Sequence, residues 1–379
     1  MDTLLTDLFR AYYNARSNKR NTPSQLRFEM NLETNLINLY HDLRDRKYKP
    51  LPSVCFVVQD SVKREVFASD FRDRVVHHLY YNYVAALFDR QFIYDSYSCR
   101  KGKGTLLGIE RLQRHIRAVS RNYTREAYIL KLDIRGYFMS INRTLLCNMV
   151  HEMIEKVRMP CDVKDIVCYL TDIITMKDPM QGAIKKGNPS GWKDLPPTKC
   201  LSCSPPGVGM PIGDLTSQLY SNVFLSKLDW FVTQTLGFRH YGRYVDDFYI
   251  VDTDLTRLEH AVPAISGLLS SLGLSLHPKK VRLQKVTRPM SYLGAVVYPF
   301  YRHCSSRTMR RYMHYKRVYE ELSGHDGLPQ AGLNVSRCLS SMNSYLGYLG
   351  HFSAEAQRSG ICIYTKTQGV NPINGNPSK

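Results

Sequence analysis

The chain has 379 residues, 43% of them hydrophobic, which is enough for a globular protein of two or three structural units with a sizeable core. Its 52 lysines and arginines against 33 aspartates and glutamates leave a net charge of +19, so we expect a polyanionic partner, nucleic acid rather than a membrane surface. No segment approaches the roughly 18 consecutive apolar residues of a spanning helix. The N-terminal residues also lack the pattern of a secretory signal, so we expect no membrane and reduced cysteines in a cytoplasm.

The first third of the sequence predicts helices, one strand and a basic loop. The expected elements are two helices within 1–46, separated by the basic segment 16–22, a strand at 53–58, a helix at 69–88 and another ending near 119. A loop rich in glycine and basic residues, 96–105, precedes the last of these helices. Its cations, which we expect to bind nucleic-acid phosphates, are Arg100, Lys101 and Lys103.

The middle of the sequence alternates apolar strands with helices. The expected elements are a strand at 127–134, helices at 143–157 and 162–175, a loop at 177–211, a helix at 213–236, strands at 238–245 and 248–251, and a helix at 255–272. The 177–211 loop is rich in glycine, proline and lysine. A loop of this length inside a domain is usually functional.

The last part of the sequence predicts a hairpin around 292–298 and two helices within 302–350. The first of these helices is basic and has almost no acidic residues before Glu320, which favours a phosphate-facing surface. The cations that we assign to nucleic-acid binding there are Arg307, Arg310 and Arg311. From residue 365 the sequence is polar and rich in glycine, proline and asparagine, as in disordered tails.

Two adjacent aspartates, Asp246 and Asp247, stand between the apolar segments 238–245 and 248–251. Because neighbouring side chains of a straight strand point to opposite faces, both can serve one site only at or beside a tight bend, and we place both in the turn of a hairpin. Asp133 ends another apolar strand. If the strands are neighbours, three carboxylates converge at one sheet edge, and a divalent cation would relieve their repulsion. For the aspartate pair alone, the alternative is a surface turn.

Three segments, taken together, resemble the motifs of reverse transcriptases. Asp133-Ile134-Arg135-Gly136-Tyr137-Phe138 is similar to the first catalytic motif of that family, and Tyr244-Val245-Asp246-Asp247 resembles its Tyr-x-Asp-Asp motif. The segment from Gly209 to Gln218 resembles the motif between them. The motifs follow the family's order over about residues 50–300. The resemblance therefore implies an RNA-directed DNA polymerase.

The resemblance implies that Asp133, Asp246 and Asp247 are the metal-site carboxylates, with the carbonyl oxygen of Ile134 as a further ligand. Two Mg²⁺ ions, with Mn²⁺ as a possible substitute, would support in-line phosphoryl transfer. Lys280 resembles a lysine near the leaving pyrophosphate, although its neighbour Lys279 is equally basic.

The nucleotide-binding residues implied by the resemblance are Arg64, Arg74, Phe138, Ile212, Gly213 and Gln218. The two arginines would clamp the triphosphate, since a guanidinium donates two hydrogen bonds at once. The ring of Phe138 would clash with a 2′-hydroxyl and so select dNTPs. The alternatives are a surface ion pair for Arg74 and a core aromatic for Phe138.

The implied fold is α+β: a right-hand polymerase fold with fingers, an antiparallel-sheet palm backed by helices, and a short helical thumb. The expected divisions are N-terminal helices and fingers at 1–125 (with part of the palm), palm at 126–300, thumb at 301–364 and a disordered tail at 365–379. The residues resembling the hairpin that grips the primer are Tyr292, Leu293 and Gly294, which packing alone could also explain. The implied partners are an RNA template, a DNA or RNA primer, dNTPs, and an accessory protein or structured RNA encoded nearby.

Within the family, Ile212-Gly213 and Ser217-Gln218 resemble prokaryotic diversity-generating retroelements, whereas retroviral and group II intron enzymes usually carry glutamine before this glycine. An isoleucine offers only shape where a glutamine could hydrogen-bond, so we expect error-prone synthesis. Reverse transcriptases of antiviral defence share much of this motif set and are the alternative. A non-catalytic RNA-binding protein is a more remote alternative, because three carboxylates would weaken phosphate binding unless metals occupy them.

Overall fold

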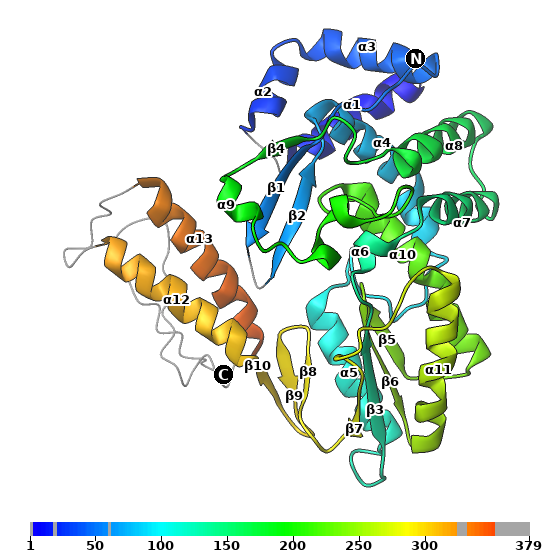
Figure 1. Cartoon of the computed structure of the whole chain (residues 1–379), viewed down its shortest axis with the longest axis vertical. Helices are drawn as coiled ribbons and strands as arrows, with labels where there is room; N and C mark the ends of the chain where they lie inside the picture. Colours follow the sequence, from blue (N-terminus) through cyan, green and yellow to red (C-terminus); the bar gives the residue numbers. More distant parts are fainter. Residues whose placement is uncertain (1–2, 18–20, 60–61, 324–331, 353–379) are drawn as a thin grey trace, which may run out of the picture. The chain divides into compact units, whose positions relative to one another are not determined.

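The computed structural model describes residues 3–17, 21–59, 62–323 and 332–352 (Figure 1). The predicted disordered tail, 365–379, lies outside them. The chain divides into two compact units, the first formed by residues 1–111 and 128–283 and the second by 112–127 and 284–379. Helix α5 (Thr105–Val119) runs along the chain from the first unit into the second.

Helices make up most of the first unit. They are α1 (Thr3–Ser17), α2 (Pro23–Glu29), α3 (Leu32–Arg44), α4 (Phe71–Asp89), α6 (Tyr137–Ser140), α7 (Arg143–Glu155), α8 (Cys161–Met176), α10 (Leu215–Trp230) and α11 (Leu255–Ser271). A π-helical turn, η3 (Phe231–Thr235), extends α10. Both α4 and α10 bury residues around most of their circumference, as central helices do.

The central sheet of the first unit has the strand order β5-β6-β3-β7. Its strands are β3 (Tyr128–Asp133), β5 (Tyr241–Tyr244), β6 (Asp247–Asp252) and β7 (Arg282–Lys285). β6 pairs antiparallel with both β3 and β5. Alternate residues of β3 and β6, such as Leu132 and Phe248, enter the core that α10 and α11 also share. The predicted α+β architecture, an antiparallel sheet backed by helices, is confirmed.

A smaller sheet in the same unit has the order β2-β1-β4. β1 (Val54–Gln59) and β2 (Lys63–Ala68) form an antiparallel hairpin, and β4 (Ile184–Lys186) pairs parallel with β1. β4 belongs to the segment 177–211, so the long predicted loop contributes a strand to a sheet that begins more than a hundred residues earlier in the chain.

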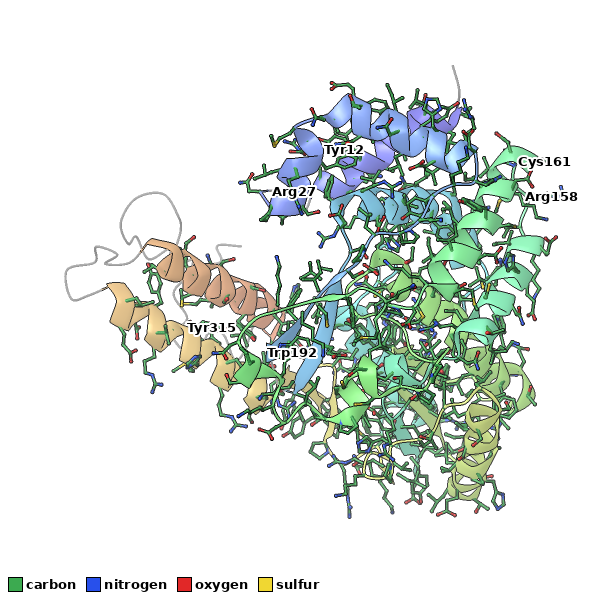
Figure 2. All side chains as sticks on the ribbon, turned by 45° about the horizontal axis from the view of Figure 1, so that its top comes forward. Tyr12, Arg27, Arg158, Cys161, Trp192 and Tyr315 are labelled. Atoms are coloured by element: carbon green, nitrogen blue, oxygen red, sulfur yellow. The ribbon has the colours of Figure 1, made fainter. Side chains whose placement is uncertain are left out.

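The segment 177–211 is a folded insertion. Besides β4 it contains α9 (Pro189–Trp192), η1 (Pro197–Lys199) and η2 (Leu201–Cys203); Trp192 is labelled in Figure 2. The buried carboxylate of Glu65 on β2 accepts a hydrogen bond of 2.5 Å from the amide of Leu201. The hydroxyl of Ser204 donates to the carbonyl of Met139, just after β3, at 2.8 Å. These contacts anchor the insertion to β2 of the smaller sheet and to α6, the short helix that follows β3.

The second unit contains the predicted hairpin and both predicted helices. The hairpin strands are β8 (Met290–Tyr292) and β9 (Ala295–Val297), and β10 (Arg302–Cys304) joins them in the order β10-β9-β8. The helices are α12 (Ser306–Ser323) and α13 (Gly332–Leu349), followed by the short turn η4 (Gly350–Phe352).

The sequence predictions differ from the structure mainly in the N-terminal part. The second helix expected within 1–46 is two helices, because the backbone leaves the helical region at Asn31 (φ −133°, ψ 52°). Strand β2 was not expected, although its residues alternate in burial as a half-exposed strand does. The helix expected to continue to residue 236 ends as a regular α-helix at Trp230 and continues as η3.

Candidate active site

Three aspartates lie at one end of the central sheet. The register of β3 against β6 sets Asp133 opposite Asp247, and the amide of Ile134 donates to the carbonyl of Asp246 at 3.1 Å. Residues opposite each other in an antiparallel pair have their side chains on the same face. The structure thus brings the three aspartates to one sheet edge, as the sequence pattern predicts.

The turn between β5 and β6 is placed differently from the prediction. Asp247 is the first residue of β6, so the turn holds Val245 and Asp246 rather than both aspartates. Val245 has φ +53°, an unfavourable conformation for a β-branched residue. Its amide donates to the hydroxyl of Ser98 at 3.2 Å, and its carbonyl accepts from Arg243 at 3.1 Å. Two side chains therefore hold the strained backbone beside the aspartates.

A fully buried ion pair lies beneath this turn and was not singled out from the sequence. Arg243 on β5 and Asp229 on α10 are 0% and 1% exposed and share two hydrogen bonds of 2.7 Å. The Tyr241 hydroxyl donates to the same carboxylate at 2.7 Å. Because buried charges persist only when paired and hydrogen-bonded, this pair fixes β5 to α10. The sequence signal for this ion pair was an arginine in the middle of a predicted apolar strand, where a charge needs a partner.

The segment 95–98 runs beside β5 as a further strand-like neighbour. Arg243 donates its amide to the carbonyl of Asp95 and accepts from the amide of Tyr97, both at 2.9 Å. The side-chain amide of Asn222 on α10 donates to the carbonyl of Ser98 at 2.9 Å. The first residues of the predicted basic loop are therefore part of the scaffold under the Asp246 turn.

The basic loop itself divides into structural and exposed cations. Arg100 was predicted to bind phosphates, but its side chain is only 6% exposed and donates to the Asp89 carboxylate at 2.5 Å and to the carbonyl of Ile93 at 2.6 Å. This arginine holds the loop together, and its predicted contact with phosphates stays a prediction. The ammonium of Lys103 lies 4.0 Å from the centre of the Tyr94 ring, whereas Lys101 is exposed.

Burial dominates the electrostatics of the aspartates. Burial raises the pKa of Asp246, and the charge of Asp133 raises it further. Burial also raises the pKa of Asp247 to about 6, while Lys131 on β3 acts in the opposite direction. Carboxyl groups that are desolvated and repel each other gain strongly from a nearby cation.

The residues present fit a hard divalent cation. Their candidate ligand atoms are all oxygens, as Mg²⁺ and Mn²⁺ prefer. The Oδ1 atom of Asp247 is buried without a hydrogen-bond partner, while its Oδ2 atom lies 3.0 Å from the ammonium of Lys131. The carboxylate oxygens of the three aspartates do not all lie within 4.8 Å of one another. In the described part of the chain, one group of His, Cys, Asp or Glu side chains does meet this distance, and it lies on α7 and α8.

Lys280 reaches the same edge from the segment after α11. The amide of His277 donates to the carbonyl of Asp133 at 2.8 Å, so this segment runs along the end of β3. The ammonium of Lys280 then lies 2.8 Å from Oδ2 of Asp133, with side-chain exposures of 53% and 13%. Between the two lysines left open by the sequence, Lys280 is the one whose side chain contacts a predicted catalytic aspartate; Lys279 is exposed.

Ile212 and Gly213 dock onto β2 through their backbone. The amide of Phe67 donates to the carbonyl of Ile212 at 2.8 Å. Gly213 has φ +134°, and a Cβ there would lie 2.1 Å from the Phe67 carbonyl oxygen, so this position requires glycine. The Ile212 side chain is half-buried against a small apolar cluster formed by Cys55, Phe67, Met139 and Leu201.

A cavity of about 470 Å³ opens next to this backbone contact, with walls from α1, β1, β2, α4 and the start of α10. Its volume is typical of small-molecule sites. Three of the predicted nucleotide-binding residues line it, namely Arg74, Gly213 and Gln218. Arg64 is exposed on β2 and Phe138 is half-buried against Tyr137, and neither belongs to the lining.

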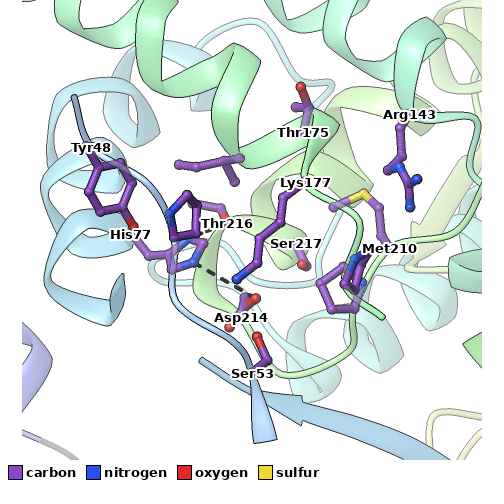
Figure 3. Close-up of a pocket in the computed structure, with 14 residues that line it drawn as sticks. Tyr48, Ser53, His77, Arg143, Thr175, Lys177, Met210, Asp214, Thr216 and Ser217 are labelled. Carbon is purple, nitrogen blue, oxygen red and sulfur yellow. Dashed lines mark hydrogen bonds and ion pairs between the residues drawn. The ribbon is translucent and has the colours of Figure 1, made fainter. Parts of the chain in front are cut away.

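A second cavity, of about 30 Å³, lies beneath the 209–218 segment (Figure 3). His77 and Asp214 face each other there at 3.9 Å, and His77 also hydrogen-bonds Thr216 at 2.8 Å. The Ser69 hydroxyl donates to Asp214 at 2.6 Å. Since this volume accommodates roughly one water molecule, the network positions the start of α10 and is too small for a nucleotide.

The predicted primer grip forms the β8–β9 turn in the second unit. Leu293 and Gly294 both have positive φ, +50° and +85°, as in the tight turns that suit β-hairpins. The Tyr348 hydroxyl of α13 donates to the Leu293 carbonyl at 3.0 Å, and the amide of Ser305 donates to the Gly294 carbonyl at 2.7 Å. Tyr292 is buried, so the turn is held firmly within its unit.

The basic helix α12 presents part of its charge to solvent. Arg307 and Arg310 are exposed, and Arg310 donates to the Ser306 carbonyl at 3.3 Å. Arg311 is half-buried. Two further cations are paired one turn on, Lys316 with Glu320 at 3.9 Å and Arg317 with Glu321 at 3.6 Å.

The folded insertion adds a cation that the sequence did not single out. Burial raises the pKa of Asp246, and Lys199 in η1 is one of the charges that oppose this rise. Its neighbour Thr198 packs on the turn after β3: a Cβ at Gly136 would lie 3.3 Å from the Thr198 side chain. The position of Lys199 near Asp246 results from contacts between segments distant in the sequence, so no local sequence pattern indicates it.

Comparisons with known proteins place the chain in a family. A family model described as reverse transcriptase (RNA-dependent DNA polymerase) matches residues 64–297. With the α+β architecture, this match confirms the predicted right-hand polymerase fold. No curated protein sequence matches the chain. None of the described helices has both the length and the apolar character needed to cross a bilayer.

Similar solved structures include two telomerases, each in complex with the TWJ fragment of telomeric RNA. The one from Candida tropicalis has 11% identity and a TM-score of 0.48, with coverage of 82% of this chain and 55% of that chain. The one from Candida albicans has 13% identity and a TM-score of 0.46, with coverage of 88% and 59%. The chain thus spans a little over half the length of these proteins.

Proposed function

This chain belongs to the reverse transcriptase family, and on that premise we propose that it synthesises DNA on an RNA template. The observation that carries the proposal is the convergence of Asp133, Asp246 and Asp247 at one edge of the central sheet. We assign residues 1–125 to fingers with part of the palm, 126–300 to the palm and 301–364 to the thumb. A template–primer hybrid and dNTPs are the proposed substrates.

The aspartates would hold the metal ions, with the Ile134 carbonyl as a further ligand. Bound Mg²⁺ or Mn²⁺ would supply charge stabilisation for the attacking and leaving oxygens of an in-line phosphoryl transfer. The unpartnered, buried Oδ1 of Asp247 supports this role. Asp246 and Asp247 are half-buried, and this partial desolvation strengthens the electrostatic interactions of both carboxylates.

Lys280 is proposed to act on the leaving pyrophosphate. Its ammonium already lies 2.8 Å from Asp133, at the edge where the phosphates would bind. An ammonium there can neutralise the leaving group and donate a proton to it. We assign Arg74, Gly213 and Gln218 to the nucleotide or its template base, because they line one cavity of suitable size. Arg64 and Phe138 are proposed to contact the triphosphate and the sugar.

The test is extension of a labelled primer on RNA by the purified chain with dNTPs and Mg²⁺. Asp246→Asn should reduce the rate by more than about 100-fold, since even partners one step removed from a metal change activity roughly 10–100-fold. The same variant should still bind the RNA–primer hybrid. Unchanged extension by Asp246→Asn would contradict the proposal, and loss of both binding and extension would have to be separated from misfolding by thermal melting.

We further propose that synthesis is error-prone and that the enzyme serves a prokaryotic diversity-generating retroelement. Ile212, at the place where retroviral and group II intron enzymes usually carry glutamine, supports this assignment, because its side chain packs in an apolar cluster and offers no hydrogen bond. An accessory protein or structured RNA encoded nearby is the expected partner. Deep sequencing of cDNA tests the proposal: errors concentrated opposite adenine agree with it, and faithful cDNA favours a role in antiviral defence.

A further inference from the structure

Helices α7 and α8 bring together three side chains with no role in the proposed polymerase reaction. Cys147 and His151 are four residues apart on α7 and therefore share one face of that helix. Asp172 lies on α8, which packs against α7 (Figure 1). One ligand atom from each residue lies within 4.8 Å of the other two.

The contacts within this group are close and converge on one oxygen. The Nε2 atom of His151 lies 2.7 Å from Oδ1 of Asp172, and the Cys147 thiol donates to the same oxygen at 3.4 Å. Cys147 as a residue is 7% exposed, whereas the His151 and Asp172 side chains are 34% and 62% exposed. The group is thus closed on the thiol side and reachable from solvent on the other.

We propose that Cys147, His151 and Asp172 form a zinc site that links α7 to α8. Thiolate sulfur, imidazole nitrogen and carboxylate oxygen are the three ligand types that Zn²⁺ takes in proteins, and a thiolate disfavours Mg²⁺. A water molecule would complete the usual four ligands on the exposed side. In the part of the chain that the structure describes, no other set of His, Cys, Asp and Glu meets the same distance criterion.

The position of the site suggests what zinc would do. α7 follows closely on the turn after β3, and α8 ends where the folded insertion 177–211 begins. A metal bridge between the two helices would fix the relative placement of these segments, one carrying Asp133 and the other carrying Lys199. Zinc would thus stabilise the native state through binding, with no part in phosphoryl transfer.

The experiment uses the full chain without a polyhistidine tag, stripped with a chelator and kept reduced. Addition of Zn²⁺ should give one tightly bound ion per chain and a melting temperature that rises with zinc concentration. Co²⁺ in its place should give a thiolate-to-cobalt charge-transfer absorption. Asp246→Asn serves as the background for all measurements, because it weakens metal binding at the aspartate edge.

Three variants decide the outcome. Cys147→Ser should abolish the cobalt–thiolate absorption, and His151→Gln, at a partly exposed position, should weaken zinc binding by at least about tenfold. Cys161→Ser is the matched control, since this exposed cysteine (Figure 2) lies on α8 outside the group. The proposal is overturned if the stripped chain does not bind one added Zn²⁺ ion per chain, or if Cys147→Ser and His151→Gln bind it as the control does.

Discussion

Two ion pairs contact the segments that carry the predicted catalytic aspartates, and they differ in burial and in the number of hydrogen bonds. Arg243 and Asp229 are fully buried beneath the Asp246 turn, whereas Lys280 and Asp133 meet at the exposed edge with a lysine that is 53% exposed. The first pair is bidentate and further hydrogen-bonded by Tyr241. The second is a single contact on the solvent side of the edge, with the Lys280 side chain half exposed, and such pairs contribute less to stability.

The difference separates scaffold from chemistry. The buried pair sets the conformation of the backbone that carries Asp246, and its charges have no access to substrate. The exposed pair leaves both groups able to exchange partners when phosphates or cations arrive. Stability and activity should therefore respond oppositely to substitutions in the two places.

The largest effect on activity is expected at the exposed pair. Asp133→Asn should lower the primer-extension rate by more than about 100-fold, because it removes a proposed metal ligand. The free energy of unfolding should change by no more than about 1 kcal/mol, as for other exposed ion pairs. Primer extension measures the expected loss of rate, and urea unfolding measures the free energy of unfolding. A large loss of stability would show that Asp133 is part of the scaffold.

The largest effect on stability is expected at the buried pair. Arg243→Met leaves Asp229 charged and unpaired in the core, so the free energy of unfolding should fall by about 3–5 kcal/mol. The double variant Arg243→Met with Asp229→Leu should recover much of that loss. Activity should stay low in the double variant, because the hydrogen bond to the Val245 carbonyl is still missing. Recovery of full activity would show that Arg243 is not needed to position the turn that carries Asp246.

A smaller effect on rate is expected for Lys280→Ala. If Lys280 assists the leaving pyrophosphate, kcat should fall about 10²-fold while the KM for dNTP changes less. Lys279→Ala is the matched control, since this neighbour is exposed, and should behave as wild type. Equal effects of the two substitutions would point to general charge at this edge instead of a specific contact.

The aspartates also predict a pH dependence of stability in the absence of metal. The pKa of Asp247 is raised from 3.8 to about 6 by burial, so the folded state binds a proton more readily than the unfolded state between these values. The melting temperature in a chelator should therefore rise as pH falls from about 7 towards 4, against the usual acid destabilisation. Added Mg²⁺ should reduce this rise. Asp247→Asn, which removes the titrating group, should abolish much of it.

The smallest effect is expected for Ile212→Gln. The side chain is half-buried in a small apolar cluster, so stability should fall by about 1 kcal/mol, while errors opposite adenine should decrease. Ile212→Leu is the control for packing alone. An error spectrum that is the same in wild type and both variants would dissociate Ile212 from fidelity.

How far the sequence predicts this molecule depends on the range of the interaction. Asp133 could be placed because it ends a strongly apolar strand, and Asp246 because it stands in a turn between two strand-like segments; both are local patterns in the sequence. Arg243 and Asp229 escaped because their pairing joins β5 to α10, and no local pattern reports a contact between elements. The structural contacts of Arg100 escaped for the same reason, because its partners Asp89 and Ile93 lie outside the loop that carries it. The proximity of Lys199 to Asp246 depends on how the insertion 177–211 folds back onto the turn after β3, which no local pattern reports.

The backbone contact between residues 212 and 213 and strand β2 separates two tasks that often fall on one residue. The Ile212 carbonyl and the bare Cα of Gly213 join the segment to Phe67, so the attachment does not depend on which side chain residue 212 carries. A change from isoleucine to another side chain therefore leaves this backbone contact intact. Position 212 can thus vary in its side chain without loss of the attachment to β2, and position 213 cannot, because a Cβ there would collide with the Phe67 carbonyl oxygen.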